Sequence, residues 1–142
     1  MNPETPLRIL CVDDSLAIQK ITRIALEKIG GFSVSFCDSG RKVLAQAKTV
    51  DPDLILLDAV LPGGDGLEIF SKLAQDPQTR GISVIFLTAK SEPQELLRYR
   101  NTGALAVLRK PFDPFRLADQ LRCIWEDYQS SLQRSASHDS LK

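Results

Sequence analysis

Five short apolar runs along the chain constrain its fold more than any other feature. They span residues 7–12, 32–37, 54–57, 82–87 and 104–109. Each is followed by a segment typical of a helix, at residues 15–29, 41–49, 67–74, a stretch ending near Gly103, and a last helix from 115 to at least 126. Nearly unbroken apolar runs of this length predict buried strands, whereas residues 32–37 alternate like a less fully buried strand. Strands that alternate with helices favour a parallel sheet with right-handed crossovers. We therefore expect an α/β fold, a doubly wound five-stranded parallel sheet with five helices.

The first helix has a defined start, an apolar face and an end. Ser15 is expected to open it, and Gly30 with Gly31 to stop it. The residues that share one face at helical spacing are Ile18, Ile21, Thr22, Ala25 and Ile29. This face is predicted to pack on the sheet.

Boundary signals also mark the last two helices. Ser91 and Gln94 have the spacing of a capping box for the fourth helix, and Gly103 is an end signal. Asp113 and Pro114 form a helix start, with a capping carboxylate and a proline in the first turn.

The length of 142 residues fits one domain with a substantial core. We divide it into an N-terminal extension (1–6), a domain (7–129) and a serine-rich tail (130–142) expected to be disordered at its end. The only histidine, His138, lies in this tail, which argues against histidine-based acid–base or metal chemistry within the chain.

Charge and hydropathy exclude several classes of partner. The chain carries 18 basic and 18 acidic residues, so no basic excess points to nucleic acid. No apolar stretch approaches the ~18 residues of a membrane-spanning helix, and the N-terminus lacks an apolar signal core. A cytoplasmic protein is expected. Of the three cysteines, Cys11 and Cys37 lie in apolar runs and are predicted to be buried thiols.

The apolar run 54–57 ends in Asp58 and then breaks into proline and glycines. Asp58 is thus predicted to close a central strand at the edge of the sheet where open parallel sheets bind ligands. A helix-capping or turn-forming aspartate is the simpler reading of this residue alone.

Three other strand ends carry polar residues that change this reading. The first strand ends in Asp13 and Asp14, the fourth in Thr88 and the fifth in Lys110. Carboxylates this close would raise one another's pKa unless a cation such as Mg²⁺ neutralised them. Thr88 and Lys110 could neutralise the oxygens of a transferred phosphoryl group, with Asp58 as the nucleophile. Each residue alone has an ordinary structural role available, as a cap or a surface charge.

With these residues in view, the chain resembles the receiver domains of two-component response regulators, of the single-domain chemotaxis type. The resemblance covers Leu7 to Tyr128. The motifs that carry it are Val12-Asp13-Asp14-Ser15, Leu57-Asp58 followed by Pro62-Gly63-Gly64-Asp65-Gly66, Leu87-Thr88-Ala89-Lys90, and Lys110-Pro111-Phe112.

The resemblance implies a flavodoxin-like strand order, 2-1-3-4-5, and a role for each site residue. Asp58 would be the phosphoacceptor for a phosphohistidine. Mg²⁺ would be held by Asp13, Asp14, Asp58 and the backbone carbonyl of Val60.

The resemblance further implies that Thr88 and Lys110 hold the phosphoryl oxygens and that the Lys110–Pro111 bond is cis. The implied partners are a histidine kinase or a histidine phosphotransfer protein of a phosphorelay. A homodimer or a target could use the face formed by helix four, strand five and helix five, where Tyr128 and Leu132 are expected to project past the sheet. Only self-phosphorylation and self-dephosphorylation are expected, not turnover of a separate substrate.

Val107 departs from the family pattern. An aromatic residue is common three positions before the lysine and turns inward on activation, whereas valine has no ring to turn. Phosphoryl chemistry is expected to survive, with the signal passing through residues 89–93 and the fourth helix instead.

Two alternatives stay open, and one is excluded. A degenerate receiver could act as a phosphorylation-independent binding module. An aspartate-nucleophile phosphatase would need a second aspartate two residues after Asp58, where Val60 stands. A dinucleotide-binding protein would need a glycine-rich phosphate loop after the first strand, and Asp13 and Asp14 occupy that place.

Overall fold

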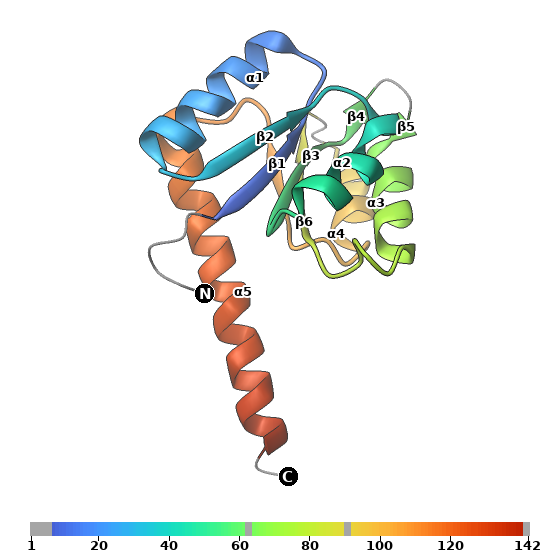
Figure 1. Ribbon diagram of the computed structural model, residues 1–142, viewed down its shortest axis with the longest axis vertical. Helices are drawn as coiled ribbons and strands as arrows, with labels where there is room; N and C mark the ends of the chain where they lie inside the picture. The colour runs from blue at the N-terminus through green and yellow to red at the C-terminus, as the bar shows by residue number, and fades with distance from the viewer. Residues whose placement is uncertain (1–6, 62–63, 90–91, 141–142) are drawn as a thin grey trace.

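The computed structural model describes residues 7–61, 64–89 and 92–140 (Figure 1). Several predictions fall outside these residues: the N-terminal extension at 1–6, the Pro62-Gly63 part of the turn after Asp58, the end of the motif at Lys90, and the Ser91 cap.

A five-stranded parallel sheet forms the centre of the molecule. Its strands are β1 (Arg8–Val12), β2 (Ser33–Cys37), β3 (Leu54–Asp58), β6 (Ser83–Thr88) and β7 (Ala106–Arg109). They lie in the order β2-β1-β3-β6-β7, and each neighbouring pair is parallel. The predicted fold class and the 2-1-3-4-5 order are confirmed.

Successive residues of each central strand point to opposite faces of the sheet, so each strand contributes to two cores. On β3, for example, Ile55 and Leu57 join one hydrophobic cluster, whereas Leu54 and Leu56 join the other. This is why β3 reads as an unbroken apolar run: both of its faces are covered.

The helices divide between these two faces, as Figure 1 shows. One core contains residues of α2 (Val43–Val50), α3 (Gly66–Gln75) and α4 (Pro93–Arg100). The other contains residues of η1 (Ile24–Ile29), which continues α1 (Leu16–Arg23), and of α5 (Pro114–Ser140). A short 3₁₀ turn, Gly40–Lys42, leads into α2.

The apolar face predicted for the first helix is partly wrong. Thr22 and Ala25 are buried, but Ile21 and Ile29 are 40% and 45% exposed. For Ile29 the cause is a change of helix type, because residues 24–29 form a π-helix, with the Gly30 amide donating to the Ala25 carbonyl. The wider turn rotates later residues away from the positions that 100° spacing assigns. Ile21 lies before this change, in the regular α-helix. Gly30 and Gly31 do end the helix.

The last helix continues well past Glu126, which was predicted as its earliest end. Helix α5 runs to Ser140, so residues 130–140 are helical where a serine-rich tail was expected, and residues 141–142 lie outside the described residues. This segment contains neither glycine nor proline, which permits the helix to continue. Tyr128 was expected to project freely, yet it is half-buried and its ring lies 5.8 Å from that of Trp125. Leu132 is exposed, as expected.

Smaller boundaries differ by one to three residues from those predicted. Helix α4 is preceded by Glu92 as its N-cap and ends before Asn101, two residues ahead of Gly103. At the start of α5, the Asp113 carboxylate accepts the Phe115 amide, as predicted. Two short antiparallel strands after Asp58, β4 (Val60–Leu61) and β5 (Gly64–Asp65), were not predicted.

Two further expectations can be compared with the structure. Cys11 and Cys37 are buried free thiols, which confirms that prediction, and Cys123 is exposed. Among the helices of the described segments, none combines the length and apolar character needed to cross a membrane.

Candidate functional site

Parallel strands bring four predicted site residues to one edge of the sheet. Asp13 follows β1, Asp58 ends β3, Thr88 ends β6, and Lys110 follows β7. The register is continuous across the central strands, with Asp58 opposite Leu87 and Thr88 opposite Arg109. Residues almost 100 positions apart in the chain therefore meet at the carboxyl ends of the strands.

Three carboxylates form the acidic part of this site. One oxygen each from Asp13, Asp14 and Asp58 lies within 4.8 Å of the others. Asp13 and Asp58 are buried, whereas Asp14 is exposed. A set of carboxylate oxygens with one solvent-facing member suits a hard cation that keeps several waters, so the residues fit Mg²⁺ by their chemistry.

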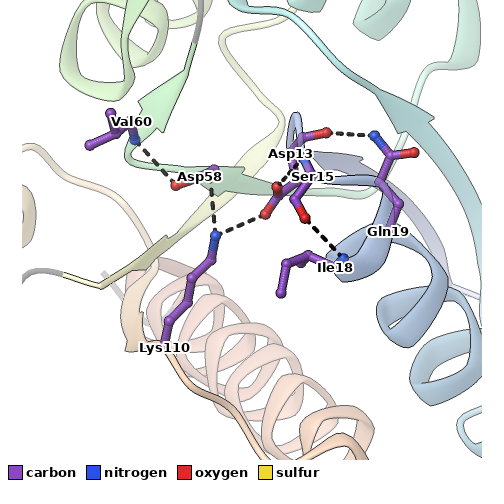
Figure 2. A network of polar contacts seen from close by, with 7 residues as sticks. All are labelled: Asp13, Ser15, Ile18, Gln19, Asp58, Val60 and Lys110. Carbon is purple, nitrogen blue, oxygen red and sulfur yellow. Dashed lines mark hydrogen bonds and ion pairs between the residues drawn. The ribbon is translucent and has the colours of Figure 1, made fainter.

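Lys110 joins two of these carboxylates. Its Nζ donates to Asp13 Oδ2 at 2.9 Å and to Asp58 Oδ2 at 3.2 Å (Figure 2). The Lys110 backbone is held as well, because its amide donates to the Thr88 carbonyl at 2.8 Å. The Lys110–Pro111 bond is cis, as the resemblance implied.

Burial and these contacts together shift the pKa values of Asp58 and Lys110. Burial raises the pKa of the Asp58 carboxyl, and the hydrogen bond from Val60 and the charge of Lys110 offset this only in part. Burial alone would lower the pKa of Lys110, but its hydrogen bond to Asp13 and the charge of Asp58 outweigh it, so the pKa is raised. Lys110 thus stays protonated at neutral pH beside a carboxylate that is costly to ionise.

We expect Asp58→Asn to raise the free energy of unfolding of the metal-free protein at pH 7. Because the pKa of Asp58 is higher in the folded state, the unfolded state ionises first as pH rises. Wild-type stability should then fall as pH rises from about 4 through the folded pKa. Urea unfolding in EDTA between pH 3.5 and 8 measures this, and the advantage of the variant should vanish below about pH 4. A variant no more stable than wild type at pH 7 would contradict the prediction.

Every polar group of Asp13 is held by a neighbour, and Figure 2 shows the contacts from Ser15, Gln19 and Lys110. The Ser15 amide donates to Oδ1 at 2.9 Å, and the Asp13 amide donates to the Cys37 carbonyl at 3.0 Å. Gln19 Nε2 donates to the Asp13 carbonyl at 2.6 Å. Sequence reasoning missed Gln19. Its place in the first turn of α1, just after the two aspartates, was the available signal.

The remaining predicted site residues lie near Asp58. The Val60 amide donates to Asp58 Oδ1 at 3.2 Å. Thr88 is buried at the end of β6. Val107 pairs with Phe86 in the β6–β7 ladder and packs against the core on the α2–α3–α4 face.

Fold and site together define a doubly wound α/β domain with an acidic cluster and a lysine at the carboxyl ends of its strands. The chain belongs to the response regulator receiver domain family, whose sequence model matches residues 9–122. It is therefore a receiver domain of two-component signalling.

Individual relatives agree with this assignment. The phosphate regulon transcriptional regulatory protein PhoB of Klebsiella pneumoniae is 36% identical over 117 residues, which make up 82% of this chain and 51% of PhoB. The regulator RpaA of Synechocystis is 37% identical over 82% of this chain and 48% of its own length. The chain thus spans about half the length of these relatives.

A solved structure shows the same fold. The chemotaxis response regulator CheY4 of Vibrio cholerae superposes with a TM-score of 0.77 at 28% identity. The match covers 84% of this chain and 99% of CheY4.

Proposed function

We propose that Asp58 accepts a phosphoryl group from a phosphohistidine in the presence of Mg²⁺, and that this switches contacts with other proteins. The observation that carries the proposal is the convergence of Asp13, Asp14 and Asp58 within 4.8 Å, with Lys110 paired to two of them. Burial also makes a charge on Asp58 energetically costly, so a change of charge at this residue would be able to bias a conformational equilibrium.

The chemistry assigns each residue a role. An Asp58 carboxylate oxygen forms the new O–P bond as the P–N bond breaks, and the departing imidazole nitrogen keeps that electron pair. Mg²⁺, held by Asp13, Asp14, Asp58 and the Val60 carbonyl, would supply positive charge for the phosphoryl oxygens. Lys110 Nζ, within 3.2 Å of Asp58 Oδ2, is placed to pair with another of these oxygens. Thr88 would contact a further phosphoryl oxygen.

The proposed donor is a histidine kinase or a histidine phosphotransfer protein. Its support is an apolar groove of about 310 Å³ beside Lys110, lined by Ile18 and Ile21 of α1 and by Pro111 and Phe112. Such a groove suits a partner that must approach Asp58 closely. Self-phosphorylation and self-dephosphorylation at Asp58 are the whole of the proposed chemistry. The proposed receiver domain comprises residues 7–129, and its proposed location is the cytoplasm.

The proposed output surface is the face of α4, β7 and α5, open to a target protein or a second copy. Leu97 on α4 and Leu132 on α5 are exposed apolar residues on these elements. Since Tyr128 is half-buried, Leu132 is the better variant with which to probe this face.

Acetyl phosphate with intact-mass spectrometry tests the proposed function. We expect one added phosphoryl group in the presence of Mg²⁺ and none in EDTA, because the carboxylates would otherwise repel the phosphoryl oxygens. Beryllofluoride should mimic this state, as it does for the receiver domain of DrrB, which was solved in a BeF₃-activated form. Absence of phosphoryl uptake both with Mg²⁺ and in EDTA would favour the degenerate binding module. Continuous release of phosphate from added phosphomonoesters would favour the phosphatase.

We expect Lys110→Ala and Thr88→Ala to weaken the beryllofluoride response at least severalfold while each variant still folds. Both residues are proposed to contact the phosphoryl group, and such contacts are charge-assisted. Amide chemical shift changes on adding beryllofluoride and Mg²⁺ measure the response. Arg109→Ala, an exposed neighbour of Lys110, serves as the control and should respond as wild type does. Undiminished changes in both site variants would make these residues structural only.

A further inference from the structure

Gln19 holds the peptide group that joins two of the three acidic residues. Its side-chain amide donates to the carbonyl oxygen of Asp13 at 2.6 Å (Figure 2), across six positions of sequence. That carbonyl belongs to the planar unit that connects Asp13 to Asp14. A hydrogen bond to its oxygen therefore limits rotation of the plane and sets the direction in which Asp14 leaves the strand.

The two aspartates depend on this peptide to different degrees. Both carboxylate oxygens of Asp13 have direct contacts, from the Ser15 amide and from Lys110 Nζ. Asp14 is exposed, and its carboxylate lies within 4.8 Å of the other two by virtue of where the backbone carries it. Its approach to the cluster is thus the property most sensitive to the Asp13–Asp14 peptide.

The helix itself does not require glutamine at this position. The Gln19 backbone amide donates to the Ser15 carbonyl at 2.9 Å, a contact that any residue except proline can make. The side chain lies at a cleft between α1 and α2 that Gln46 also lines. What is particular to Gln19 is an N–H donor at the end of a side chain of this length.

We propose that Gln19 is a positioning residue for the divalent-cation site, acting through the Asp13–Asp14 peptide to keep the Asp14 carboxylate beside Asp13 and Asp58. This deepens the proposed function and rests on it, since the cation is the one that the phosphoryl transfer requires. Residues that hold metal ligands in place commonly change metal affinity by 10–100-fold when removed.

The test compares Gln19→Met with Gln46→Met in the full chain. Both substitutions keep length and helix propensity and remove an amide donor, and Gln46 Nε2 donates to the Phe36 carbonyl at 3.3 Å in the same cleft. Mg²⁺ affinity of the unphosphorylated protein is measured by NMR titration. We expect about tenfold weaker Mg²⁺ binding in Gln19→Met, the lower end of the 10–100-fold range for such positioning residues. In Gln46→Met, we expect Mg²⁺ affinity to change by less than about twofold. Gln19→Leu, which also lacks the donor, should weaken binding as Gln19→Met does.

A second readout needs no metal. In EDTA, the Ser15 amide, which donates to Asp13 Oδ1, should exchange with deuterium faster in Gln19→Met than in wild type, and at the wild-type rate in Gln46→Met. Wild-type affinity and exchange in both Gln19 variants would overturn the positioning role and leave the proposed function standing. A wild-type protein that binds no Mg²⁺ would instead overturn the proposed function. Equal losses in the Gln19 and Gln46 variants would make the effect a general one of the cleft and contradict the inference.

Discussion

Asp58→Asn is expected to abolish phosphoryl uptake from acetyl phosphate or from a phosphorylated kinase. The amide has the shape of the carboxylate but lacks the anionic oxygen that forms the O–P bond. Lys110 keeps its contact with Asp13, so the surroundings of the site should persist. Intact-mass spectrometry after treatment with Mg²⁺ should show one added phosphoryl group in wild type and none in the variant.

Asp65→Asn is the matched control for this experiment. Asp65 lies seven residues after Asp58 and is exposed. Its carboxylate caps α3 by accepting the Leu67 amide. Asparagine caps helices about as well as aspartate, so α3 should be retained. This variant should be labelled as wild type is. Label that persists in Asp58→Asn would place the phosphoacceptor elsewhere.

Tyr99→Ala is expected to lower the free energy of unfolding by roughly 3–5 kcal/mol, as for other buried aromatic residues. Tyr99 is 2% exposed, and its ring centroid lies 4.9 Å from that of Phe86 on β6. Phe86 also contacts Phe70 of α3, so the loss would open a cavity where two helices meet the sheet. Thermal unfolding should show a midpoint lowered by roughly 10 °C.

Leu97→Ala, on the same helix, separates burial from helix propensity. Leu97 is 54% exposed, so its replacement should change stability by no more than about 0.5 kcal/mol. If the two variants were equally stable, the packing of Tyr99 against Phe86 would not contribute to stability. That result would also remove the physical basis for a tight connection between α4 and β6.

The position of Tyr99 bears on the departure at Val107. Both residues belong to the core on the α2–α3–α4 face, and both adjoin Phe86, two residues before Thr88. The aromatic ring in this region thus comes from α4, whereas the family pattern places one at the position of Val107. The predicted signal route through residues 89–93 and the fourth helix stays a prediction, because residues 90 and 91 lie outside the described residues.

The sequence-based predictions failed mainly in the type and the length of helices. A 100° periodicity placed Ile21 and Ile29 on the buried face of α1, and the π-helix at residues 24–29 turned Ile29 outward. The serine-rich composition after residue 130 indicated a tail, yet α5 continues to Ser140. Local patterns assume one helix type, which does not hold at residues 24–29. Serine-rich composition alone does not end a helix in a segment that contains neither glycine nor proline.

The sequence alone determined the sheet and the placement of Asp58. An apolar run buried on both faces, followed by turn residues, must end at the edge of a parallel sheet, and strand–helix alternation sets the crossovers. Only the tertiary structure decided which of the groups at that edge contact one another. The 2.9 Å contact of Lys110 with Asp13, the Gln19 bond to the Asp13 carbonyl and the tilted packing of Tyr99 against Phe86 join separate elements. Local periodicity carries no information about such contacts, because they depend on how whole elements pack and on which side-chain rotamers that packing permits.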